Sequence, residues 1–199
     1  MNKAGNLLSR LALALVIAEL VLVLVSWILS AAAVGSVRSL LSSEGIRWLF
    51  GHFASMLATP YLIWLLLIGM GWESVRRSGL SAPRSHRERI AFGAALTVLL
   101  LCVVVLVLLT AVPHAILLSA TGNLFPSPFS DSLVPFCAVS VMLISIVYGV
   151  VAGRFDSLHS VYETLVAGIR TAAPFVLFYM LLVQLYETVC FVFLQQPYF

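Results

Sequence analysis

The sequence predicts an all-α integral membrane protein with about five transmembrane helices, an outer amphipathic helix and a last helix kinked by proline. Of its 199 residues, 62% are hydrophobic and 10% are charged, and the mean hydropathy is +1.10. An average soluble domain has about 25% charged residues, so this chain cannot cover a water-facing surface. Five apolar stretches are long enough to cross a bilayer as helix, which takes roughly 17–25 residues. These observations exclude a soluble enzyme, a disordered chain and a nucleic-acid-binding domain.

The expected spans are helical because backbone groups in lipid must be satisfied within their own segment. The first span follows Lys3 and Arg10 in the manner of a signal peptide, but it is much longer than the roughly 7–15 apolar residues of a typical signal. We therefore expect it to be retained as a helix. Within a single membrane domain over residues 1–199, the five expected spans cover about 11–34, 53–72, 90–112, 133–152 and 175–193.

An outer amphipathic helix is expected over about 43–56, between the first two spans. Ser42 or Ser43 can cap it, and Glu44 suits the positive end of a helix dipole. Its apolar side chains recur at helical spacing on one face, which predicts a position in the membrane interface or at the edge of the bundle. Pro60 lies inside the second expected span and predicts a kink one turn before it.

A second interfacial helix is expected over about 160–172. Ser160 and Glu163 form a capping-box pattern at its start. Pro174 then breaks or bends the chain into the fifth span, because proline cannot donate a backbone hydrogen bond.

The basic residues orient the expected bundle. All eleven Lys and Arg residues lie outside the five spans, nine of them on one side and two on the other. The positive-inside rule then places the N-terminus in the cytoplasm and the C-terminus outside a bacterial inner membrane. One cytoplasmic loop is expected to face anionic lipid through five arginines, which are Arg76, Arg77, Arg84, Arg87 and Arg89.

Glu19 is the one charged residue of the first span, and it lies roughly 12 Å in from Leu11, near mid-membrane. A charge there costs at least about 2.5–3.5 kcal/mol, so this carboxyl should face protein or water, or be protonated. Two interpretations follow. Glu19 forms a hydrogen bond that fixes helix packing, or it belongs to a proton relay or ion pathway.

Other polar and small residues in the spans have two interpretations each. Gln184 and Glu187, three residues apart, form a polar stripe that can meet a partner helix, or Glu187 snorkels and pairs outside the bilayer. Gly149 and Gly153, four residues apart, let another helix approach closely, or they are small residues of the kind that is common in membrane helices in any case. The three cysteines lack metal-ligand spacing, and no nucleophile–base set or phosphate loop occurs. We expect no enzyme activity, metal or cofactor.

Several segments resemble p-aminobenzoyl-glutamate (AbgT-type) transporters, in the same order along the chain. SLLSSEGIRWLF resembles the segment after that family's first membrane helix, and LLIGMGWESVRRSGL resembles the end of its second helix. PSPFSDSLVPF, Tyr148-Gly149 and the Gln184 region follow in the same order. The residues that match in the first three segments are Leu40, Leu41, Ser42, Glu44, Gly45 and Trp48, then Gly69, Gly71, Glu73, Ser78, Gly79 and Leu80, then Pro126, Ser127, Pro128, Phe129 and Pro135.

The resemblance implies a longer transporter, in which two re-entrant hairpins and their partner helices form the moving, substrate-binding core. Here the next span begins within ten residues of Leu80, and the sequence ends after the Gln184 region, where a second hairpin would begin. The resemblance therefore implies the scaffold half, which in the family also makes the dimer contact. No substrate or ion ligand carries over.

Three functions follow from this combination. The first is a scaffold or subunit that forms a homodimer or binds a separate membrane protein. The second is a small proton-coupled transporter that acts as an oligomer, with Glu19 carrying the proton. The third is a membrane sensor or regulator. The expected partners are the lipid bilayer and membrane proteins rather than nucleic acid, and the substrate stays unknown.

Overall fold

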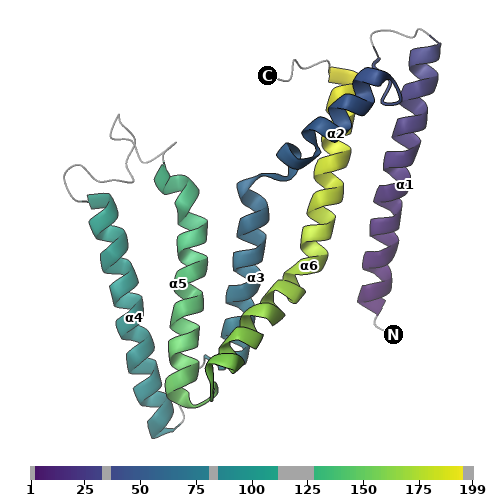
Figure 1. Ribbon diagram of the computed structural model, residues 1–199. Coiled ribbons are helices and arrows are strands. Elements are labelled where there is room, and N and C mark those ends of the chain that lie inside the picture. Colours follow the sequence, from purple (N-terminus) through teal and green to yellow (C-terminus); the bar gives the residue numbers. More distant parts are fainter. Residues whose placement is uncertain (1–2, 33–36, 81–84, 112–127, 195–199) are drawn as a thin grey trace. The chain divides into compact units, whose positions relative to one another are not determined.

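The computed structural model describes residues 3–32, 37–80, 85–111 and 128–194, and these residues form helices and no strands (Figure 1). The predicted all-α membrane class is confirmed, because four helices are long and apolar enough to span a bilayer and one bent pair is a fifth candidate. The elements are α1 (Lys3–Ala31), α2 (Ser43–Leu57), α3 (Pro60–Ser78), α4 (His86–Ala111), α5 (Pro128–Ala152), α6 (Leu158–Val189) and a π-helical turn, η1 (Cys190–Leu194).

The second expected span is divided differently from the prediction. Pro60 is the first residue of α3 rather than an interior residue, and α2 and α3 are bent by 43° at the break before it. The Ala58 N–H closes α2 by donating to the Ala54 carbonyl oxygen at 3.1 Å. Proline fits the first turn of a helix, where its missing N–H would have no partner within the helix. The expected kink is therefore a break between two helices.

The last helix also differs from the prediction, because α6 continues through Pro174 and joins the two expected segments. It begins at Leu158, where the Ser157 Oγ accepts the Ser160 N–H at 3.3 Å. Ser157 therefore caps the helix, and the expected capping box of Ser160 and Glu163 does not form. Proline inside a membrane helix is tolerated when neighbouring groups satisfy the backbone that it leaves unpaired.

The chain divides into two compact units. Unit 1 comprises Met1–Leu62 and Pro174–Phe199, and unit 2 comprises Ile63–Ala173. The single membrane domain over residues 1–199 stays a prediction.

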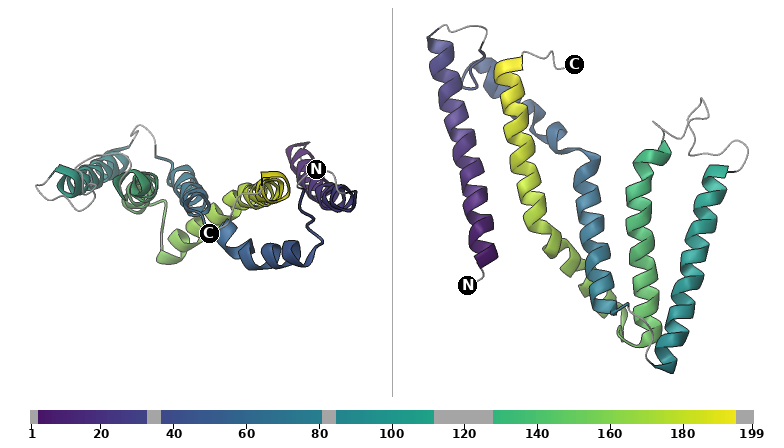
Figure 2. Two further views of the ribbon diagram at one scale, coloured as in Figure 1. Left: turned by 90° about the horizontal axis from the view of Figure 1, so that it is seen from above. Right: turned by 180° about the vertical axis from the view of Figure 1, so that it is seen from behind.

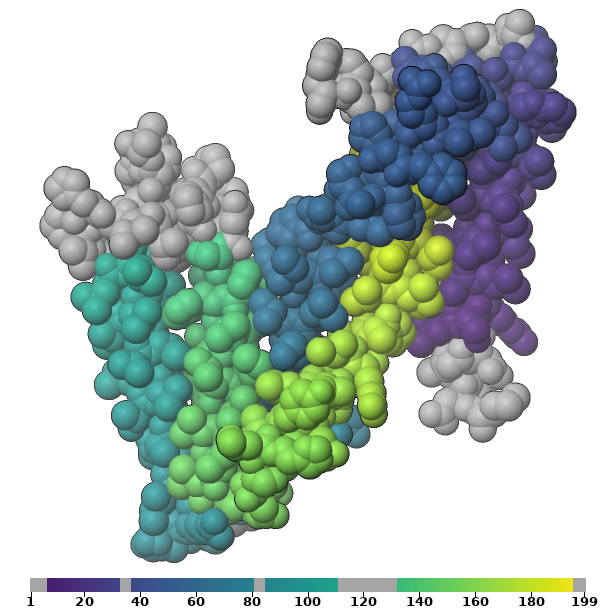
Figure 3. Space-filling model, viewed as in Figure 1, coloured from purple at the N-terminus to yellow at the C-terminus, as the bar shows by residue number. Residues whose placement is uncertain are grey.

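Unit 1 packs α1, α2 and the last part of α6 around a small core. Ser42 caps α2, as the sequence predicts, because its Oγ accepts the Gly45 N–H at 3.0 Å. The Trp48 indole stacks on the Phe191 ring with centroids 4.4 Å apart. Figure 3 shows α2 covering the end of α6 on one face of this unit. The buried core consists of Leu40, Trp48, Phe191 and Val192.

Unit 2 holds most of α3, with α4, α5 and the first part of α6. α4 and α5 lie side by side in the two views of Figure 2. α3 and α6 approach each other at two glycines. A methyl group added at Gly69 would lie 2.6 Å from the Ala172 Cβ, and one added at Gly168 would lie 2.5 Å from the Met70 Cα. The buried core beside α4 and α5 consists of Ala91, Ala95 and Tyr148.

Candidate intramembrane polar site

A polar cluster of Glu19, Gln184 and Thr188 joins α1 to α6 within unit 1. The Thr188 hydroxyl donates to Glu19 Oε1 at 2.7 Å, and the Gln184 amide donates to the Thr188 Oγ1 in a longer bond of 3.5 Å. Thr188 is fully buried. Gln184 and Thr188 share one face of α6 because they are four residues apart. The cluster therefore pairs an intramembrane carboxyl with a hydroxyl of the neighbouring helix.

The second carboxyl oxygen of Glu19 has a different environment. Glu19 Oε2 is buried and has no hydrogen-bond partner among the described residues. A buried polar oxygen without a partner is costly, and a charged one in the hydrocarbon layer is costlier still. One oxygen thus holds α1 to α6, and the other stays available to carry a proton or to accept a donor.

The structure brings together two of the three polar residues that the sequence selected. Glu19 and Gln184 meet through Thr188, which sequence reasoning did not select, although its position one turn after Gln184 was the available signal. Glu187 is half-buried and lies outside this cluster. Arg38 pairs with Glu44 at 3.6 Å.

Gly149 of α5 and Gly153, which follows the helix, lie against side chains of their own unit, and the expected contact with another helix stays a prediction. Gly149 faces the ring of Phe155, in the turn after the same helix. Gly153 ends α5 with a φ of 77° and lies against the guanidinium of Arg87. A left-handed residue at a helix C-terminus is usually glycine, because no Cβ clashes there. The close helix approach in unit 2 occurs between α3 and α6.

Two arginines of the predicted basic loop pair within α3. Glu73 is buried at 6% exposure, and its carboxylate accepts from the Arg77 Nε at 2.9 Å and lies 3.8 Å from an Arg76 nitrogen. Arg76 is the more exposed of the two arginines. These pairs neutralise the buried carboxylate near the end of α3.

Arg87 and Arg89 of this loop lie in the first turn of α4. The Arg87 Nε donates to the Val151 carbonyl oxygen at 3.1 Å, and Arg154 pairs with Glu88 at 3.7 Å. Arg89 is exposed, and Arg84 lies outside the described residues. The contact of this loop with anionic lipid stays a prediction.

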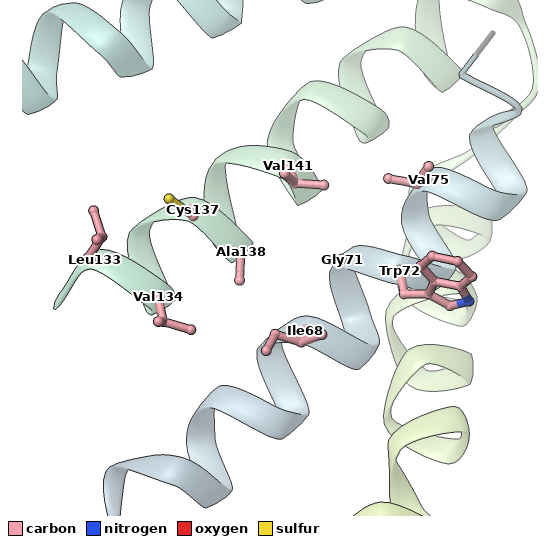
Figure 4. Close-up of a pocket in the computed structure, with 9 residues that line it drawn as sticks. All are labelled: Ile68, Gly71, Trp72, Val75, Leu133, Val134, Cys137, Ala138 and Val141. Atoms are coloured by element: carbon pink, nitrogen blue, oxygen red, sulfur yellow. The ribbon is translucent and has the colours of Figure 1, made fainter. Parts of the chain in front are cut away.

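An apolar groove of about 420 Å³ lies between α3 and α5 in unit 2 (Figure 4). Its polar surface is negligible, so it has no group that would orient a polar substrate. In the described part of the chain, no group of three or more His, Cys, Asp or Glu residues could hold a metal ion. The groove is lined by Ile68, Gly71, Trp72 and Val75 of α3 and by Leu133, Val134, Cys137, Ala138 and Val141 of α5.

Long apolar helices joined by a buried polar cluster define a multi-pass membrane protein. The chain belongs to the AbgT putative transporter family, whose family model matches residues 73–192. This match covers more than half of the chain and confirms the resemblance seen in the sequence. It begins at Glu73, so the segment SLLSSEGIRWLF lies before it. The family is one of transporters rather than enzymes. Comparisons with curated proteins and with solved structures found no match.

Proposed function

We propose that this chain is a transport-associated scaffold or subunit that carries the scaffold and dimerisation half of an AbgT-type protein and lacks the hairpin core. The observation that carries the proposal is the short connection between α3, which ends at Ser78, and α4, which begins at His86. Seven residues reach at most about 25 Å when fully extended. They leave no room for a re-entrant helical hairpin between the two helices.

The polar cluster supports a packing role for the intramembrane acid. Glu19 Oε1 accepts a hydrogen bond from the Thr188 hydroxyl, and this bond links two helices of one unit. Such bonds in membranes average about 0.6 kcal/mol. We place the protein in a bacterial inner membrane with the N-terminus in the cytoplasm and the C-terminus outside, because this orientation puts nine of eleven basic residues inside.

The proposal is tested on protein purified in mild detergent and in lipid nanodiscs. We expect a homodimer by light scattering, or a stoichiometric complex with a second membrane protein after affinity purification from native membranes. An unrelated membrane protein with the same tag and a similar size serves as the control. A stable monomer that catalyses substrate-dependent uptake in liposomes would refute the scaffold role.

A second candidate function rests on the unpaired oxygen of Glu19. A buried carboxyl with one open oxygen can take up and release a proton, as intramembrane acids do in coupled transporters. In this alternative, an oligomer supplies the pathway and Glu19 carries the coupling proton. Loss of proton-driven uptake in Glu19→Gln, with retained folding, would favour the transporter over the scaffold.

A further inference from the structure

A small charged cavity lies where α2 meets η1 in unit 1. Its volume is about 250 Å³, and its lining combines charged and aromatic side chains. It lies at the end of α6 that is far from Pro174. The lining residues are Arg38, Glu44, Arg47, Trp48, His52 and Phe191.

The aromatic wall of this cavity is part of the unit's core. Trp48 stacks between His52, at a centroid distance of 6.3 Å, and Phe191, at 4.4 Å. The His52 Nδ1 donates to the Trp48 carbonyl oxygen at 3.2 Å, which fixes the imidazole on the helix. Gly45 is in contact with the backbone of Leu40, so α2 is pressed against the preceding segment. The wall is therefore preformed.

The cavity carries more positive than negative charge. Arg38 lies over the Phe191 ring, 5.8 Å from its centroid, and pairs with Glu44 at 3.6 Å. Arg47 forms no ion pair or hydrogen bond with the described residues. Two guanidinium groups therefore face one carboxylate, and Arg47 has no counter-ion in the part of the chain that the structure describes. A guanidinium presents its N–H donors in a fork that matches an oxyanion.

The face of α2 that points away from the cavity indicates at which depth of the membrane the cavity lies. Ile46, Phe50 and Phe53 recur at helical spacing and are exposed, with Phe50 at 80%. An amphipathic helix with aromatic side chains on one face and cations on the other lies in the membrane interface. At that depth, the phosphate of a lipid headgroup is the most abundant oxyanion.

We propose that Arg38 and Arg47 form a binding site for a phosphate-type oxyanion, and that its ligand in the membrane is the headgroup of an anionic phospholipid. Arg47 supplies the unpaired guanidinium. Arg38 turns from Glu44 toward the phosphate, and its stacking on Phe191 limits the entropy lost in doing so. This site is separate from the five-arginine loop.

The test compares lipid retention by the full chain in detergent, using native mass spectrometry with phosphatidylglycerol and phosphatidylcholine. We expect wild type to prefer phosphatidylglycerol, and Arg47→Gln and Arg38→Gln each to weaken that preference by about fivefold. Arg170→Gln is the matched control, because it removes the same charge from an exposed position on α6. Arg47 is exposed, so its variant is expected to fold even if Arg38→Gln does not.

Two outcomes would overturn the proposal. Equal loss of preference in Arg47→Gln and Arg170→Gln would show general charge attraction without a site. Saturable binding of inorganic phosphate to wild type, without any preference for phosphatidylglycerol, would overturn the lipid as ligand. Loss of preference in Arg47→Gln and Arg38→Gln but not in Arg170→Gln, with only partial recovery in Arg47→Lys, supports a guanidinium site.

Discussion

A single hydroxyl connects two of the three polar residues that the sequence singled out in the spans. Glu19 and Gln184 are 165 positions apart, and Thr188 bonds to both. A threonine in a membrane helix usually bonds to a carbonyl oxygen of its own helix, as Thr171 does with Ala167 at 3.0 Å. Thr188 instead bonds to a carboxyl of another helix, so its contribution is to tertiary structure.

We therefore expect Thr188→Val to lower the free energy of unfolding by about 0.6 kcal/mol, and by no more than about 1.7 kcal/mol. Glu19→Gln keeps an oxygen acceptor for the Thr188 hydroxyl and is expected to leave the fold nearly unchanged. The measurement is reversible denaturation in mixed micelles. Thr171→Val is the control, because it removes an exposed hydroxyl from the same helix. A loss in the control as large as in Thr188→Val would contradict a tertiary role.

At the scale of elements, α3 and α6 depend on two glycines for their close approach. An added methyl group at Gly168 would lie 2.5 Å from the Met70 Cα and 2.8 Å from the Gly69 carbonyl oxygen. Both are backbone atoms, so no side chain can rotate away and the helices must separate. Small residues at interfaces are how membrane helices gain close packing.

Gly168→Ala is accordingly expected to destabilise the protein by about 1–3 kcal/mol, the usual range for overpacking. Gly93→Ala is the matched control, because a methyl group added there on α4 meets nothing within 4 Å. Both substitutions replace a helical glycine by alanine, so the difference between their effects on stability isolates the cost of the added methyl group at the contact of α3 and α6. Thermal unfolding in detergent measures this difference. Equal unfolding midpoints for the two variants would show that the backbones of α3 and α6 do not pack at these glycines.

The break between α2 and α3 is a second feature of element scale. The Thr59 hydroxyl, which follows the end of α2, is hydrogen-bonded to the Tyr179 hydroxyl of α6. This bond holds the break to a helix of the same unit. We expect Tyr179→Phe to speed amide hydrogen exchange at Ala58 and Thr59, because the break between α2 and α3 is then no longer held to α6 and opens more often. Exchange in α5 is the internal reference, and unchanged exchange at the break would refute this role.

At the scale of the whole molecule, the distribution of Lys and Arg along the chain predicts how the protein is oriented in the membrane. With the N-terminus in the cytoplasm and five spans, a fluorescent protein fused to the N-terminus should be bright, and one fused to the C-terminus should be dark. Alkaline phosphatase fused to the C-terminus should be active, because it folds only outside. The physical reason is the translocation bias against loops rich in Lys and Arg. The opposite pattern at both ends would contradict the proposed orientation.

The predicted elements differed from the observed ones where a proline could be read in two ways. Pro60 begins a helix, although it was expected to lie inside a span and kink it, and Pro174 lies inside a helix, where it was expected to break or bend the chain. Proline loses a helical hydrogen bond only in the interior of a helix, and whether that loss is tolerated depends on the surrounding helices. Local sequence does not contain that information.

Sequence alone determined the membrane class, the number of candidate spans and the family, because these depend on composition, on the length of apolar stretches and on local segments. Tertiary structure decided which polar groups meet. Glu19 could be recognised as an intramembrane acid from its position, but its partner Thr188 depends on how α1 and α6 pack and rotate. The same holds for the glycines, since Gly69 and Gly168 became the close contact only when their helices were paired. Helix pairing is non-local, whereas hydrophobicity is a property of each segment.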